Sequence, residues 1–211
     1  LKYTHWTGTA WEPETVDWEG DVGWTPSLAL DSADRPHVSY WDYTNGDLKY
    51  AYYTDAGWQL ETADSVGNVG SFTSLALDSA DRPHISYYDG TNKDLLYARW
   101  TGTAWHIETV DSVGDVGSFT SLALDSADRP HISYYDETNS DLMYARWTGA
   151  VWKTETVDSA GNMGSYTSLA LDGADRPHIS YYNGTNSDLM YARWTGAAWK
   201  TDTVDSEEDV G

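Results

Sequence analysis

The sequence is dominated by one stretch, SLALDSADRPHISYYD, which begins at Ser121 and recurs in closely related form three more times. The other copies begin at Ser27, Ser74 and Ser168, so neighbouring copies are always 47 residues apart. A fixed period of this size indicates a repeat architecture, in which each unit packs on its neighbours. The repeat therefore constrains the fold more than any single residue does.

The repeat divides a single domain into one partial and four whole units. The partial unit, 1–23, matches the second half of a whole unit, because Leu1-Lys2-Tyr3 aligns with Leu48-Lys49-Tyr50. The whole units are 24–70, 71–117, 118–164 and 165–211. Since the chain begins without Met and inside a repeat, we expect a processed, excised or incompletely known protein.

Each unit predicts four short strands and no helix. In the unit that starts at Ser118, the strands are expected at residues 120–125, 131–135, 142–147 and 152–157, where apolar and small or polar residues alternate. Polar turns and a Gly-containing hairpin loop separate them. A Gly-containing connector, 159–164, leads into the next unit.

Four strands with hairpin-sized loops form an antiparallel meander, and these strands carry apolar groups on both faces. A propeller blade between two other blades obtains cover on both faces. The sequence therefore predicts an all-β fold, a β-propeller of four-stranded antiparallel blades, with about four and a half blades in this chain. A β-solenoid and an open array of blades are the alternatives.

By analogy with other propellers, the strand at 120–125 should be innermost and the strand at 152–157 outermost. The partial unit then supplies only two outer strands. We expect the missing inner hairpin to precede Leu1, to come from a partner chain, or to belong to a larger ring that several chains share.

The net charge of −22 disfavours nucleic acid and anionic membrane surfaces as partners. No segment approaches the ~20 apolar residues of a membrane span. The chain has no Cys, which excludes disulfides and thiolate chemistry.

Two Trp residues per unit lie near an Arg and an acidic residue, a combination that suits sugars. The aromatic ring can cover a C–H face while the charged groups bond to hydroxyls. Packing between blades is the alternative role for the same residues. The candidate ligand-binding residues are Arg99, Trp100, Trp105, Glu108, Arg146, Trp147, Trp152, Glu155, Arg193, Trp194, Trp199 and Asp202.

The polar turns place oxygen ligands at alternating positions, as weak calcium sites do. Turns in which Asp bonds to nearby backbone amides explain the same residues. His37, His84, His131 and His178 recur at one position, where a structural hydrogen bond is the favoured role over metal or anion binding. No other cofactor is expected. The calcium candidates are Asp89, Asn92, Asp94, Asp136, Asn139 and Asp141.

Trp18, Trp24 and Trp41 have no Trp equivalents in the later units. Terminal units of repeat proteins are often atypical, so these residues are expected to mark an end blade or a contact with a partner.

The units resemble the SLALDSxGxPHISYYD-type repeats of secreted microbial β-propeller proteins over essentially the whole chain. The spacing is similar to that of tachylectin-like five-bladed lectins, and the YY-D and aromatic-turn-Trp rhythm resembles the fungal fucose-binding propellers. The resemblance implies an extracellular or cell-surface protein. The Gly-Gly-Trp connector of tachylectin and the SxDxGxTW box of sialidases do not occur here.

Repetition argues against catalysis, because an active site gathers dissimilar residues in one place. We therefore expect a non-enzymatic binding module with several equivalent carbohydrate sites between blades. The alternative is a structural protein whose incomplete end blades join chains into rings, filaments or a surface layer, with the half blade forming the homo-oligomer contact. A sialidase-like glycoside hydrolase is a distant alternative.

Overall fold

The computed structural model describes residues 1–207, and this part of the chain folds entirely into β-strands and turns. The first two strands form a separate hairpin, and the following sixteen form four sheets of four strands each. No helix long and apolar enough to cross a membrane occurs in the described residues.

The four sheets are successive units of the repeat, and we call them blades 1 to 4. The N-terminal hairpin is β1 (Lys2–Trp6) and β2 (Trp11–Thr15). Blade 1 is β3 (Val22–Leu30), β4 (Pro36–Asp42), β5 (Asp47–Thr54) and β6 (Gly57–Asp64). Blade 2 is β7 (Val69–Leu77), β8 (Pro83–Asp89), β9 (Asp94–Trp100) and β10 (Trp105–Asp111). Blade 3 is β11 (Val116–Leu124), β12 (Pro130–Asp136), β13 (Asp141–Trp147) and β14 (Trp152–Asp158). Blade 4 is β15 (Met163–Leu171), β16 (Pro177–Asn183), β17 (Asp188–Trp194) and β18 (Trp199–Asp205).

Every blade is an antiparallel meander in which consecutive strands pair. In blade 3, Leu122 pairs with Ile132, Ile132 with Ala145, and Trp147 with Trp152 across the last hairpin. A β-solenoid requires parallel coils, so this strand order excludes it. The predicted meander is confirmed.

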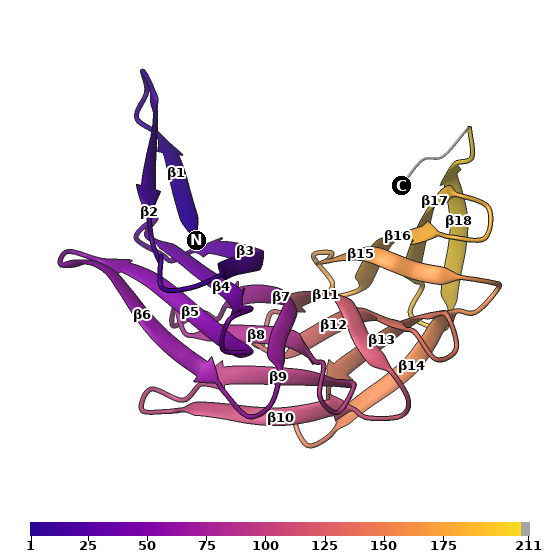
Figure 1. Cartoon of the computed structure of the whole chain (residues 1–211). Helices are drawn as coiled ribbons and strands as arrows, with labels where there is room; N and C mark the ends of the chain where they lie inside the picture. The colour runs from indigo at the N-terminus through magenta and orange to yellow at the C-terminus, as the bar shows by residue number, and fades with distance from the viewer. Residues whose placement is uncertain (208–211) are drawn as a thin grey trace.

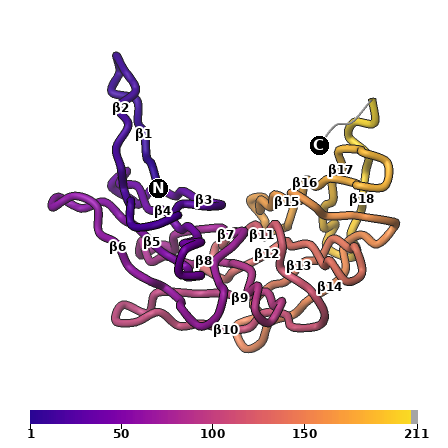
Figure 2. Tube along the Cα trace, in the orientation of Figure 1, coloured from indigo at the N-terminus to yellow at the C-terminus, as the bar shows by residue number. Residues whose placement is uncertain are grey.

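The blades are arranged side by side along an arc with their first strands innermost (Figure 1). The inner strands β3, β7, β11 and β15 contact one another in sequence, whereas the outer strands touch much less. The arc does not close within the described residues, and the β1–β2 hairpin and β18 stand at its two ends (Figure 2). This is the propeller arrangement, observed as an open arc.

The core lies between blades. At the junction of blades 2 and 3, Leu95 and Tyr97 of β9 pack on Leu122 and Ile132 of the next blade. The same type of cluster fills the other junctions. Apolar residues on both faces of the strands of blades 2 and 3 are therefore buried because each of these blades lies between two others.

The inner strands begin earlier than predicted. In blade 3 the strand starts at Val116 instead of residue 120, and in blade 4 it starts at Met163, inside the predicted connector. The pairing register shifts between Val116 and Ser121, and Phe119 has a left-handed φ of 53°. These irregularities interrupt the alternation, which is why the sequence pattern shows only the second half of the strand.

The unusual Trp residues of the first units lie in and just before blade 1, with Trp18 in the connector that precedes β3. Trp24 pairs with Trp41 across β3 and β4 and is 52% exposed, and its Nε1 donates to Asp21 Oδ1 over 2.8 Å. Trp18 is also exposed. Their role at an end blade or a partner contact stays a prediction.

Candidate functional site: pockets between blades

Four pockets lie at the junctions between neighbouring blades, all at the end of the blades where the second strand begins and the third ends. We name them by the units that form them. The 2/3 pocket has a volume of about 340 Å³ and the 3/4 pocket about 280 Å³. The hairpin/1 pocket has about 290 Å³ and the 1/2 pocket about 210 Å³. Their common position makes them repeated versions of one site.

The turn between the first and second strands builds one rim of each pocket. In blade 3, Asp125 Oδ1 accepts from the backbone N of Ala127 and of Arg129, each over 2.9 Å. Its Oδ2 accepts from Arg129 Nε over 2.6 Å. Burial alone would raise the pKa of Asp125, but these hydrogen bonds and the Arg129 charge lower it below its ordinary value. The charged turn therefore holds Arg129 in place beside the pocket.

A second contact ties this turn to the preceding blade. Asp128 has a left-handed φ of 57°, and its carboxylate accepts from the backbone N and the Oγ of Ser79, over 3.0 and 2.5 Å. The same bond joins Asp81 to Ser32 and Asp175 to Ser126. The distance between the two rims is therefore set in the same way at three junctions.

The floor of the 2/3 pocket includes a buried His and Tyr from blade 2. His84 Nδ1 is hydrogen-bonded to the hydroxyl of Tyr97, and its Nε2 lies 3.5 Å from Asp78 Oδ2. Burial lowers the pKa of His84, although Asp78 opposes that shift. The recurring His therefore makes structural hydrogen bonds. Among residues 1–207, no group of three or more His, Cys, Asp or Glu side chains is placed to hold a metal ion.

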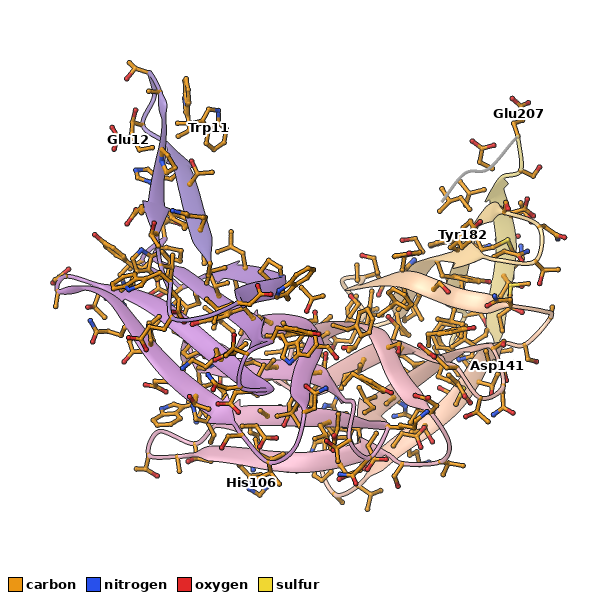
Figure 3. The ribbon with its side chains drawn as sticks, viewed as in Figure 1. Trp11, Glu12, His106, Asp141, Tyr182 and Glu207 are labelled. Atoms are coloured by element: carbon orange, nitrogen blue, oxygen red, sulfur yellow. The ribbon has the colours of Figure 1, made fainter. Side chains whose placement is uncertain are left out.

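Arg99 and Glu108 form one wall of the 2/3 pocket. Arg99 Nε lies 3.9 Å from Glu108 Oε1, and His106 Nε2 lies 3.0 Å from the same oxygen. His106 is labelled on the outer strand β10 in Figure 3. Glu108 Oε2 accepts from Trp152 Nε1 of the next blade over 2.9 Å. The carboxylate therefore joins the two blades and lines the pocket.

Blade 3 contributes aromatic side chains to the same pocket. Trp147 lines the pocket together with Trp152, and their ring centroids are 5.6 Å apart at an angle of 62°. Trp152 also packs edge-on against Tyr97 of blade 2, 5.2 Å away. An aromatic pair from one blade and an Arg–Glu pair from the other thus line one pocket.

The predicted site sets of blades 2 and 3 are each divided between two pockets. Arg99 and Glu108 line the 2/3 pocket, whereas Trp100 of the same blade lines the 1/2 pocket. Arg146 and Glu155 likewise line the 3/4 pocket, to which blade 4 contributes Trp194. Successive residues of a strand point to opposite faces, so neighbours such as Arg99 and Trp100 cannot face one junction. The residues predicted in a single unit therefore do not share one pocket, and each pocket takes its lining from two neighbouring units.

The two Trp positions of a unit have different surroundings. Trp105 donates to Glu61 Oε2 over 3.1 Å and packs edge-on against Tyr50, 5.3 Å away. Trp152 makes the equivalent contacts, and Trp199 packs on Tyr144, but its buried Nε1 has no partner among the described residues. The expected packing role thus fits Trp105, Trp152 and Trp199, while Trp100, Trp147 and Trp194 line pockets.

Four predicted residues lie outside the four pockets: Trp105, Trp199, Arg193 and Asp202. Arg193 Nη2 and Asp202 Oδ2 are 4.0 Å apart on blade 4, and no blade follows it in residues 1–207. Conversely, Arg82 and Arg129 line the 2/3 pocket but were not among the predicted site residues. The recurrence of Asp-Arg-Pro in every whole unit was the signal that could have found them.

The loops with the calcium candidates are closed by their own hydrogen bonds. Asp89 Oδ1 accepts from the backbone N of Thr91 over 2.8 Å, and its Oδ2 accepts from Asn92 Nδ2 over 2.8 Å. Asp136 and Asn139 make the same side-chain bond over 2.8 Å. Because the Asn side-chain amide donates its N–H₂ to the Asp carboxylate, the geometry favours a hydrogen-bonded turn over a calcium site. Burial and a neighbouring Asp raise the pKa of Asp94 and of Asp141. Calcium binding stays a prediction.

No family model matches the sequence, and no curated protein matches it. Solved structures do match the fold. A protein of unknown function from Dyadobacter fermentans aligns over 88% of this chain and 70% of its own, with 10% identity and a TM-score of 0.65. A variant of the Aleuria aurantia lectin in complex with Fucα1-6GlcNAc aligns over 96% and 70%, with 15% identity and a TM-score of 0.61. A Hadza microbial sialidase aligns over 90% and 47%, with 12% identity and a TM-score of 0.60.

At these identities the similarity shows the fold alone. The repeated four-stranded antiparallel sheets resemble those of a fucose-lectin propeller, and the same arrangement also occurs in an enzyme. The function must therefore be argued from the pockets.

Proposed function

We propose that this protein is a non-enzymatic, multivalent carbohydrate-binding module that uses the pockets between blades. One observation carries the proposal: Arg99 and Glu108 of one blade and Trp147 of the next line the same pocket of about 340 Å³. An aromatic face covers the C–H groups of a pyranose, and a charged pair exchanges hydrogen bonds with its hydroxyls. The 2/3 pocket offers both.

The repeat multiplies this site. Trp100, Trp147 and Trp194 line the 1/2, 2/3 and 3/4 pockets, and each pocket also contains a Glu from the preceding blade. Three similar sites on one rigid arc favour a glycan surface with many copies of one sugar, because linked sites multiply weak affinities. Such ligands occur outside cells, which supports an extracellular or cell-surface location.

The pocket chemistry favours binding over hydrolysis. The same group of Trp, Glu, His and Tyr recurs from pocket to pocket, whereas catalysis requires distinct groups that converge once. The buried His84 is committed to Tyr97 and Asp78. These features support the lectin-like proposal over a sialidase-like one.

Replacing the pocket Trp residues tests the proposal. We expect Trp100→Ala, Trp147→Ala and Trp194→Ala each to remove one of three sites and the triple variant to lose binding, because stacking contributes about 1 kcal/mol or more per ring. A glycan array that includes Fucα1-6GlcNAc identifies the ligand, and isothermal titration counts the sites. Trp6→Ala is the matched control, since Trp6 occupies the same repeat position, lines none of the four pockets and is 53% exposed. Equal losses for Trp6→Ala, or unchanged binding in the triple variant, would contradict the proposal.

We further propose that a second copy of the chain covers the open face of blade 1. Leu28 and Leu30 are 56% and 53% exposed there, whereas Leu75, which corresponds to Leu28 in blade 2, is only 7% exposed. A preceding blade covers Leu75. The β1–β2 hairpin already packs on Val38 and Tyr40 of blade 1, in the place of the outer strands of a preceding blade. The second copy would therefore supply only the inner strands that this hairpin lacks. Blade 4 has an open face of its own, where Val204 is 60% exposed and its equivalent Val157 is 9% exposed.

Sedimentation of the wild type and of Leu28→Asp tests this contact. We expect the wild type to associate as its concentration rises, and Leu28→Asp to remain monomeric because it places a charge in the interface. Leu60→Asp on the outer strand β6, where Leu60 is 43% exposed, is the control that should associate normally. A wild-type protein that is monomeric at every concentration would exclude the contact.

A further inference from the structure

The arginines of this acidic chain are concentrated at two of the four pockets. The chain has seven Arg residues against 34 Asp and Glu residues. Arg82, Arg99 and Arg129 all line the 2/3 pocket, and Arg129 and Arg146 line the 3/4 pocket. In the hairpin/1 pocket Arg35 is the one Arg in the lining, and the 1/2 pocket has none in its lining.

The carboxylates around the 2/3 pocket are already engaged. Asp78 accepts from the backbone N of Ala80 over 2.9 Å and from Arg82 Nε over 2.7 Å. Asp128 accepts from Ser79, and Glu108 accepts from Trp152. Acceptor positions of these carboxylates are thus taken by groups of the protein itself, and Asp78 is also paired with the Arg82 charge.

The guanidinium groups retain donors for a ligand. Arg82 and Arg129 bind their own Asp residues through Nε, and each side chain remains about half exposed, at 50% and 47%. Arg99 makes only a 3.9 Å contact with Glu108 and is 43% exposed. A guanidinium has five N–H donors in a planar fork that matches carboxylate and other oxyanions. The 2/3 pocket therefore presents unused positive donors beside an aromatic wall.

The 1/2 pocket is the internal comparison. Tyr52 stands there at the repeat position of Arg99, while His37, Glu61 and Trp100 occupy the positions of His84, Glu108 and Trp147. Burial and the nearby Glu61 raise the pKa of Tyr52, so this phenol stays neutral. Both pockets therefore contain a Trp at the same repeat position, but only the 2/3 pocket has an arginine at the position of Arg99.

We propose that the 2/3 and 3/4 pockets select saccharides that carry a carboxylate or sulfate group, whereas the 1/2 pocket takes neutral saccharides. This inference rests on the proposed function. Trp147 and Trp194 would stack on the sugar ring, and the Arg fork would bind the anionic substituent. Because the pockets are only partly exposed, these bonds are stronger than ion pairs on an open surface.

The test compares three matched probes by isothermal titration: methyl glucoside, methyl glucuronide and methyl glucoside 6-sulfate. We expect the wild type to bind two equivalents of at least one anionic probe, about tenfold or more tighter than methyl glucoside, as one charge-assisted bond allows. The glucuronide and sulfate arms distinguish the two sources of the anion. Arg99→Tyr should leave one anionic site, and Arg99→Tyr with Arg146→Tyr should leave none.

Introducing an arginine into the 1/2 pocket distinguishes a selective effect on binding from misfolding of the variants. Tyr52→Arg should add a third anionic site to the wild-type pair, which a damaged protein could not do. Lys153→Tyr removes the same charge from an exposed position outside the pockets and should change neither site number nor affinity.

The possible failures are distinguishable. If both anionic probes and methyl glucoside bind with equal affinity at Trp-dependent sites, the proposed function stands and the anionic selectivity is wrong. If Lys153→Tyr weakens binding as much as Arg99→Tyr does, overall charge explains the preference and the selectivity of the pocket is also wrong. If no saccharide of the array or of the three probes binds, both proposals fall.

Discussion

Raising the pH above about 10 should unfold this protein in one steep transition. Seven tyrosines that are at most 4% exposed have a pKa raised above the ordinary 10.0, chiefly because burial disfavours the phenolate. Nearby carboxylates such as Asp64 beside Tyr87 add to the shift. The tyrosines are Tyr40, Tyr50, Tyr87, Tyr97, Tyr134, Tyr144 and Tyr181.

The direction in which pH changes the free energy of unfolding follows from proton linkage. In the unfolded chain these phenols lose their protons as the pH rises through 10.0, whereas in the folded chain they keep them. The unfolded state then binds fewer protons, so the free energy of unfolding falls as the pH rises. Each linked tyrosine contributes about 1.4 kcal/mol per pH unit. Seven together approach about 10 kcal/mol per unit, which is comparable to the whole stability of an ordinary domain.

Circular dichroism and tyrosinate absorbance, followed in the same titration, test this prediction. Loss of the strand signal should coincide with the ionisation of the buried phenols, and a titration in concentrated urea supplies the unfolded reference. Complete ionisation of the tyrosines with the sheets still intact would show that the buried phenols are not what limits alkaline stability.

Gly117→Ala should lower the free energy of unfolding by about 3–5 kcal/mol, among the larger effects of single substitutions. Gly117 has a φ of +106°, and a Cβ added there would lie 2.8 Å from the Cα of Leu95 in the preceding blade. The clash is with backbone, so it can be relieved only by separating blades 2 and 3. Gly70 and Gly164 approach Leu48 and Leu142 in the same way.

Gly102→Ala is the matched control for backbone strain. Gly102 also has a positive φ, +97°, but nothing lies within 4 Å of an added Cβ. Gly102→Ala should lower the free energy of unfolding only by the cost of the unfavourable φ, about 1–3 kcal/mol. Urea unfolding of both variants measures the difference between their free energies of unfolding. Equal losses would show that the close approach of the blades adds nothing to the effect of Gly117→Ala.

The sequence predicted the blades because strand alternation and repeat spacing are local signals. It did not predict the start of the inner strand, since Gly117 and Phe119 adopt left-handed φ values that break the alternation. Only the packed structure shows that Gly117 is required where its backbone meets Leu95.

The residues predicted as a candidate site in blades 2 and 3 are distributed by the structure between neighbouring pockets. Period-two alternation already implied that Arg146 and Trp147 point to opposite sides of a blade, and applying it would have placed them in different pockets. The role of Arg129 depends on a turn that reaches toward both neighbouring blades, as its place in two pockets shows. Such contacts depend on the angle between blades, which no strand pattern encodes.

Crystal structures of the protein soaked separately with Fucα1-6GlcNAc and with methyl glucuronide would test the central claim most directly. The account predicts a sugar ring on Trp147, between it and the wall formed by Arg99 and Glu108, in at least one of the two soaks. Sugar bound only outside the four pockets, or empty pockets in both soaks, would contradict it.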